Sequence, residues 1–145
     1  MITPDATMSQ QVADAVTKFQ TERTGHAPQT VTVVLNDDTL VVMLHEALSP
    51  AEIVLSRTPD GASFVRDFHR RLFDSSVGSL REEIKRITGV PIREAAVEVE
   101  TAAGAVEHVF ASGTMVQVFR LDSGITPQAW NGHKTNHSVC CQPAA

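Results

Sequence analysis

Leu48-Ser49-Pro50-Ala51-Glu52 is the point at which this chain passes from strand-forming to helix-forming sequence. A serine hydroxyl can cap the first turn of a helix, and proline suits the first helical position, where no amide hydrogen is needed. Glu52 follows Ser49 by three residues, so its carboxylate can accept a hydrogen bond from the Ser49 amide. We therefore assign Ser49, Pro50 and Glu52 a structural role as a helix cap.

Strand-forming sequence precedes this joint. Residues 30–35 and 40–45 are rich in valine and threonine, and Asn36-Asp37-Asp38-Thr39 supplies turn residues between them, which predicts an antiparallel hairpin. Further upstream, apolar residues recur at helical spacing over residues 8–24, and Gly25 follows them. This pattern predicts an amphipathic helix that ends at Gly25.

Helix-forming sequence follows the joint. Pro59 and Gly61 interrupt the first helix after about two turns, and Thr58-Pro59 can start a second one. Apolar residues at helical spacing then continue until Gly89 and Pro91. We expect one helix of nearly 30 residues, roughly 40 Å long at 1.5 Å per residue.

Alternation with a period of two returns after Pro91. Residues 94–100 alternate alanine and valine with glutamate, as in a strand with one solvated face. Residues 106–111 and 115–121 are also strand-like, and Ser112-Gly113-Thr114 between them is either a tight turn or a bulge within one long strand. The whole order, αββααββ(β), predicts an α+β fold in which helices pack on one face of an antiparallel sheet of four or five strands.

The composition fits one domain without a nucleic-acid or bilayer-spanning role. The chain has 145 residues, 42% of them hydrophobic, and a formal net charge of -5, which gives no reason to expect nucleic-acid binding. No apolar run approaches the roughly 20 residues that span a bilayer, so we expect no direct membrane insertion. We expect a single domain over residues 1–122 and a flexible tail over residues 123–145.

The order of these patterns resembles the MpsC-like family, a bacterial domain named for a component of a Na+-translocating membrane-potential-generating system. The matching segments lie within residues 8–122 and are Phe19-Gln20, residues 25–35, residues 40–44, residues 48–52, Ile87-Thr88-Gly89 and Val116-Gln117-Val118-Phe119. The resemblance implies a soluble component or partner of an ion-translocating membrane system concerned with inorganic-carbon supply. It brings no catalytic residues to carry over.

The residues that could bind zinc lie near the end of the chain: His133, His137, Cys140 and Cys141. Adjacent cysteines seldom chelate one tetrahedral ion, and the surrounding sequence lacks core-forming residues. We therefore expect no metal site and no cofactor. Two adjacent cysteines also cannot form a normal disulfide framework, which favours a reducing, cytoplasmic location. The family resemblance implies in addition that a partner can hold the chain at the inner face of the membrane.

The predicted long helix carries basic residues, of which Arg66, His69 and Arg70 are candidates to contact an anion or a partner. Acidic residues at helical spacing accompany them. We favour the interpretation of a solvated face with local ion pairs.

The length of this helix also predicts self-association. A helix of about 40 Å exceeds what strands of five or six residues can cover, so part of its apolar side should meet a second chain. One assignment turns Phe64, Phe68 and Leu72 to the sheet and leaves the second half of the helix for a dimer interface; the reverse is equally open. The interface candidates in the second half are Val77, Leu80, Ile84 and Ile87.

No nucleophile elbow or phosphate-binding glycine loop occurs in the sequence, and the glutamates of residues 94–100 are explained as a solvated strand face. We therefore expect a non-enzymatic homodimer that acts by protein binding. The family resemblance implies a membrane transport protein as a further partner. The alternative is a dimeric regulatory module that senses a small ligand or an anion. A polar pocket between helix and sheet with converging arginine or histidine would favour that alternative.

Overall fold

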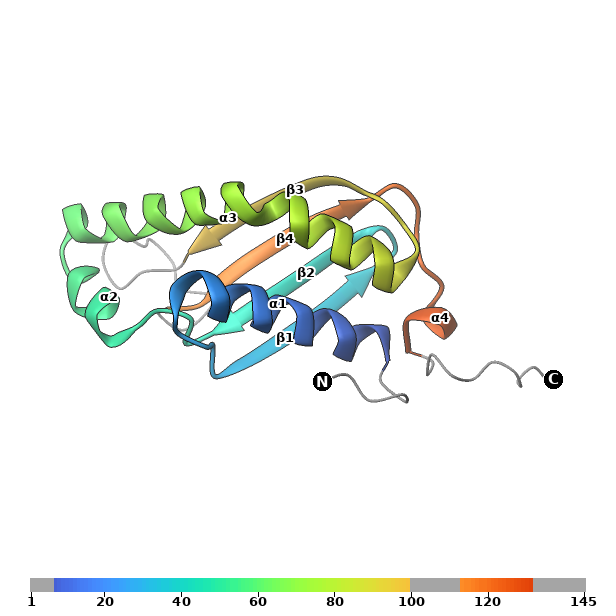
Figure 1. Ribbon diagram of the computed structural model, residues 1–145, viewed down its shortest axis with the longest axis horizontal. Helices are drawn as coiled ribbons and strands as arrows, with labels where there is room; N and C mark the ends of the chain where they lie inside the picture. Colours follow the sequence, from blue (N-terminus) through green and yellow to red (C-terminus); the bar gives the residue numbers. More distant parts are fainter. Residues whose placement is uncertain (1–6, 100–112, 132–145) are drawn as a thin grey trace.

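The computed structural model describes residues 7–99 and 113–131. The strand-like run at residues 106–111 and the four zinc-binding candidates from His133 to Cys141 lie outside these residues. Two layers make up the described part, one of helices and one of strands (Figure 1). The elements in chain order are α1 (Met8–Thr24), β1 (Thr30–Asn36), β2 (Thr39–His45), α2 (Pro50–Leu55), α3 (Pro59–Thr88), β3 (Ile92–Val99), β4 (Met115–Leu121) and α4 (Pro127–Asn131).

The four strands form one antiparallel sheet in the order β1-β2-β4-β3. Side chains alternate between its two faces: Leu40, Val42 and Leu44 of β2 are buried, and the residues between them are half-buried. Helices α1 and α3 lie across the face that carries the buried side chains (Figure 1). The predicted α+β fold, with its order αββααββ and one long helix, is confirmed.

The helices begin and end where the sequence predicts. Gly25 and Gly89 follow α1 and α3 with φ angles of 76° and 79°, a left-handed conformation that glycine adopts without strain. Helix α3 runs unbroken through Ser75-Ser76 and Gly78 for 30 residues. It is therefore longer than the sheet, and its N-terminal part extends beyond the strands together with α2 (Figure 1).

The second half of α3 packs on the sheet of its own chain. Leu80, Ile84 and Ile87 are buried in the core, and Val77 packs against it. Their assignment as dimer-interface residues is wrong, because the apolar stripe of this half covers the sheet. The first half of α3 also has a buried side, which includes Val65 and Phe73, but its two other phenylalanines lie outward: Phe64 is 61% exposed and Phe68 is 42% exposed.

The segment after β4 joins the core, which corrects the tail boundary predicted at residue 123. Ile125 and Trp130 are buried, and the Ile125 amide donates to the Asp37 carbonyl at 3.3 Å. Helix α4 packs near α1. Two well-placed apolar side chains hold this segment to the domain, although its sequence shows no apolar period.

Candidate functional site

The joint between β2 and α2 is a complete capping box. The Ser49 Oγ atom accepts a hydrogen bond from the Glu52 amide at 3.3 Å, and the Ser49 amide donates to Glu52 Oε1 at 2.9 Å. Pro50 occupies the first turn. The structural role predicted for Ser49, Pro50 and Glu52 matches this geometry.

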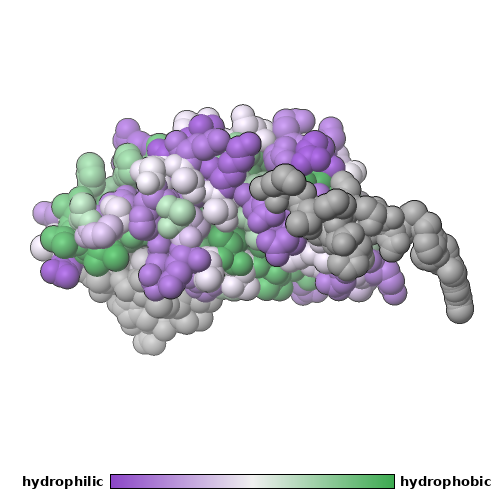
Figure 2. Space-filling view, turned by 60° about the horizontal axis from the view of Figure 1, so that its bottom comes forward, coloured by the Kyte–Doolittle hydropathy of each residue, from purple (hydrophilic) through white to green (hydrophobic). Residues whose placement is uncertain are grey.

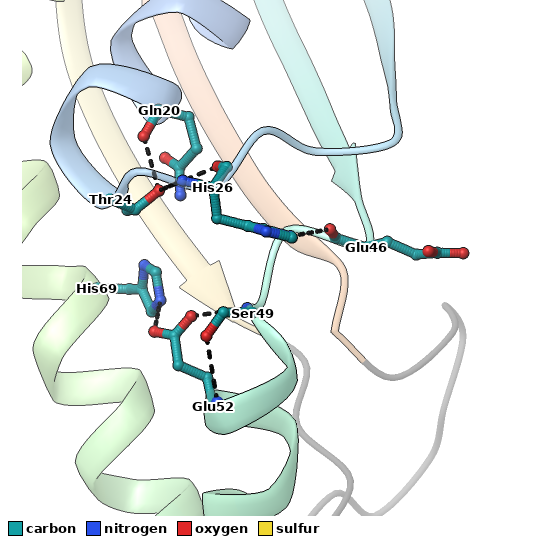
Figure 3. Close-up of polar contacts among 7 residues, drawn as sticks. All are labelled: Gln20, Thr24, His26, Glu46, Ser49, Glu52 and His69. Carbon is teal, nitrogen blue, oxygen red and sulfur yellow. Dashed lines mark hydrogen bonds and ion pairs between the residues drawn. The ribbon is translucent and has the colours of Figure 1, made fainter.

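The same carboxylate also binds the next helix. In Figure 3 the His69 ring, carried by α3, points at the Glu52 carboxylate of α2, and the His69 Nε2 and Glu52 Oε2 atoms are 2.7 Å apart. The His69 side chain is 1% exposed and that of Glu52 is 18% exposed. This pair was not predicted, because the two residues lie 17 positions apart and on different helices. The one signal that points to it is the position of His69 between two buried residues at helical spacing, Val65 and Phe73.

Three effects set the ionisation of Glu52. Burial raises the pKa of its carboxyl group, but the hydrogen bond from the Ser49 amide and the proximity of His69 outweigh burial and lower the pKa below its ordinary value. The carboxylate therefore stays ionised at neutral pH. An ionised carboxylate can accept a hydrogen bond from the Ser49 amide at the start of α2 and one from His69 of α3 at the same time.

The structure does not bring Arg66, His69 and Arg70 together as an anion site. Arg70 is exposed and Arg66 is half-buried, whereas His69 lies buried against Glu52. The expectation that His69 contacts an anion or a partner at the surface is wrong, because its ring faces into the protein.

A small cavity with both polar and apolar lining lies beside His69, between α1, α3 and β4. It measures about 20 Å³, and its lining includes Gln20, Arg23, His69 and Gln117. Gln20 Nε2 and Gln117 Oε1 are buried there and have no hydrogen-bond partner among residues 7–99 and 113–131. This volume accommodates about one water molecule.

Exposed apolar residues are concentrated on α2 and the first half of α3. Within residues 7–99 and 113–131, six large apolar side chains stand exposed, and all but Val34 lie on α2 or on the first half of α3: Ile53, Val54, Leu55, Phe64 and Phe68. We call these five the α2–α3 surface. Figure 2 shows hydrophobic residues gathered at this end of the molecule. The Phe64 and Phe68 rings stack with centroids 6.4 Å apart and planes inclined by 7°.

A shallow groove of about 230 Å³ borders the α2–α3 surface, and its lining includes His26, Glu46, Pro50 and Ile53. The His26 Nε2 atom lies 3.2 Å from the Glu46 carbonyl oxygen, so the loop after α1 is tied to the end of β2 at the edge of this groove (Figure 3). The end of β2 that leads into α2 is thus tied to the loop after α1, and His69 fixes α2 to α3. The five apolar side chains are presented on a firmly held backbone.

A comparison with models of known protein families identifies the family of this chain. The family model described as "Na+-translocating membrane potential-generating system (MpsC)" matches residues 5–113. The chain belongs to the MpsC family. No curated protein and no solved structure matches the chain. The match confirms the predicted resemblance, and it includes every residue of the α2–α3 surface of this MpsC domain.

Two negative findings apply to the described part of the MpsC domain. None of its helices is both long and apolar enough to cross a bilayer. Across residues 7–99 and 113–131, no three histidine, cysteine, aspartate or glutamate side chains are grouped so that they could hold a metal ion.

Proposed function

We propose that this MpsC-family chain is a non-catalytic component of a Na+-translocating, membrane-potential-generating system and that it acts by binding protein through the α2–α3 surface. The family match links the chain to that system. The observation that carries the binding role is the exposure of five large apolar side chains at one end of the molecule.

The size of this surface supports a binding role. An aromatic side chain presents on the order of 200 Å². Together the five exposed side chains present on the order of 500 Å², which lies toward the upper end of the largest apolar patches on monomers, and such patches often mark interaction sites. Scattered single apolar residues would need no such explanation.

The way α2 is held supports the same role. None of the residues of α2 is buried, so its six residues contribute little to the core. The helix is nevertheless fixed by the capping box at Ser49 and by the Glu52–His69 contact. A preorganised helix pays a smaller entropic cost when it binds a partner. A membrane transport protein is a further partner of the chain, and it holds the chain at the inner face of the membrane.

The test is the Na+-dependent membrane potential of the native cell, measured with a potential-sensitive dye. We expect deletion of the gene to lower this potential and the wild-type chain to restore it. A Phe64→Ser/Phe68→Ser chain should restore it poorly. Val34→Thr is the matched control, because Val34 is also exposed but lies on β1, outside the α2–α3 surface. A deletion that leaves the Na+-dependent potential unchanged would overturn the proposed function, and full restoration by the double variant would overturn the role of the surface.

A further inference from the structure

We infer that the α2–α3 surface pairs with the same surface of a second copy of this chain, through antiparallel packing of the two α3 helices about a two-fold axis near residue 66. The inference rests on the proposed binding role of this surface and names its partner. It follows from the order of exposed side chains along α3, from the area of the surface and from the charges around it.

The exposed stripe on the first half of α3 has a self-complementary order. It reads Asp60, Phe64, Phe68, Arg71, and all four residues are exposed. Their spacing of three or four positions places them on one side of the helix. An acidic residue therefore stands at one end of a phenylalanine pair, and a basic residue stands at the other end.

An antiparallel pair matches this order with itself. When the axis passes near residue 66, Phe64 meets the partner's Phe68, and Asp60 meets the partner's Arg71. Each contact occurs twice, as an isologous two-fold interface requires. A parallel pair would instead place Asp60 against the partner's Asp60, and like charges at an interface are unfavourable.

Arg71 can make this contact at small cost. Its Nε atom lies 2.9 Å from Asp67 Oδ2 in the same chain, but the two side chains are 81% and 54% exposed. An exposed pair of this kind contributes little to stability. The guanidinium can therefore turn from Asp67 to the partner's Asp60, in a contact that pairing would shield from solvent.

The area available agrees with a reversible dimer. Two copies of the α2–α3 surface can bury at most on the order of 1,000 Å² of apolar area together, which is near the lower limit for a specific interface. We expect dissociation in the micromolar range. The charges beside the phenyl rings are mixed in sign, with Asp60 and Asp67 next to Arg70 and Arg71, which fits a self-complementary protein surface.

The experiment is analytical ultracentrifugation of the full purified chain and of charge-reversed variants. We expect the wild type to dimerise, and Asp60→Arg or Arg71→Asp alone to weaken dimerisation about tenfold or more. An equimolar mixture of the two variants should dimerise again, because each mixed pair restores both opposite-charge contacts. The double variant Asp60→Arg/Arg71→Asp should dimerise for the same reason.

The mixture controls for effects within one chain. Asp60 lies in the first turn of α3, where a negative charge is favourable, so its reversal also weakens the helix. This loss of helix stability is the same in the separate variant and in the mixture. A difference in dimerisation between the two samples therefore reports only on contacts between chains. Phe64→Ser/Phe68→Ser should abolish the dimer, and Val34→Thr should keep it.

Three outcomes would overturn the inference. They are a wild-type chain that stays monomeric throughout the micromolar range, a mixture no more associated than its separate components, and a monomer that instead binds vesicles of anionic phospholipid. A monomeric chain that still supports the Na+-dependent potential would overturn this inference alone. A dimer whose deletion leaves that potential unchanged would overturn only the proposed function.

Discussion

The His69 Nε2 atom lies 2.7 Å from Glu52 Oε2, and the other oxygen of the same carboxylate accepts a hydrogen bond from the Ser49 amide at 2.9 Å. One carboxylate thus completes the start of α2 and joins α2 to α3. The contact also holds α2 and α3, which carry the exposed apolar side chains, in fixed positions relative to each other. The stability of the joint can be measured separately from any binding.

Acidification should remove the contribution of Glu52 to stability. Burial raises the pKa of Glu52, but the Ser49 amide and His69 hold the pKa below its ordinary value in the folded protein. A carboxyl group with a lowered folded pKa contributes its full stabilisation above the unfolded pKa and loses it as the pH falls through the folded pKa. We expect the free energy of unfolding, measured with denaturant near pH 7 and near pH 3, to fall more for the wild type than for Glu52→Gln.

The comparison with Glu52→Gln isolates this residue from the other acidic groups. The pKa values of Asp38 and Glu83 are also lowered, and both groups are present in both chains. Equal losses of stability on acidification in the wild type and the variant would show that Glu52 contributes nothing to the pH dependence.

Ser49→Ala should lower the free energy of unfolding by about 1 kcal/mol, because it removes the oxygen that caps the Glu52 amide. Dimerisation should persist when the variant is folded, since Ser49 is not part of the α2–α3 surface. Ser79→Ala is the control, because Ser79 is an exposed residue in the middle of α3. Its effect should stay within about 0.5 kcal/mol in chemical denaturation. If both substitutions lowered the free energy of unfolding by the same amount, Ser49 would have no specific stabilising role as a helix cap.

Two glycines of α3 should respond to alanine in opposite directions. A Cβ atom on Gly61 would lie 1.8 Å from the Leu55 carbonyl oxygen, so α2 and α3 would have to move apart at a cost of about 1–3 kcal/mol. A Cβ atom on Gly78 meets nothing within 4 Å, and alanine there should add about 1 kcal/mol through helix propensity. In thermal unfolding, the midpoint temperature should fall for Gly61→Ala and rise for Gly78→Ala. Stabilisation by Gly61→Ala would show that α2 is not packed tightly on α3.

Trp130→Ala should cost about 3 kcal/mol, because it empties a buried position between α4 and the rest of the core. The chain contains one tryptophan, so the fluorescence of the wild type reports on this site directly. We expect its emission maximum to shift to longer wavelength in the same denaturant transition that unfolds the helices. Gln128→Ala, on the exposed side of α4, should have little effect on stability. A tryptophan that is already solvent-exposed in the folded chain would contradict the position of α4.

Local signals were sufficient to predict most of the fold. The Ser49 cap, the glycines after α1 and α3, and the turn around Asp37 each depend on a few neighbouring residues. Asp37 has a φ angle of 59°, a conformation that aspartate tolerates better than most residues, and Asn36 pairs with Thr39 across the turn. These conformational preferences depend on short stretches of sequence, so they can be identified without knowledge of tertiary contacts.

The face of α3 could not be assigned in the same way. Phe64, Phe68 and Leu72 are spaced at four positions, and so are Val65, His69 and Phe73. Both sets fit helical spacing, and hydrophobicity alone favours the first. The second set is buried because it faces the core. Val65 and Phe73 belong to the hydrophobic cluster, the Phe73 ring packs against Phe119 of β4, and Glu52 of α2 accepts the hydrogen bond that buried His69 needs. The buried face of α3 thus depends on contacts with other elements that no single-helix pattern contains.

The centre of the sheet has a consequence for the order of folding. Strand β2 pairs with β4, and the pairs Leu44–Met115 and Thr39–Arg120 join distant parts of the chain. A growing polypeptide can form the β1–β2 hairpin early, but the neighbour of β2 is made only after α2, α3 and β3. Pairing over such a distance carries a large loop-closure cost and is slow compared with hairpin formation. During synthesis the open edge of β2 is therefore the part of this protein most in need of protection from pairing with the wrong strand.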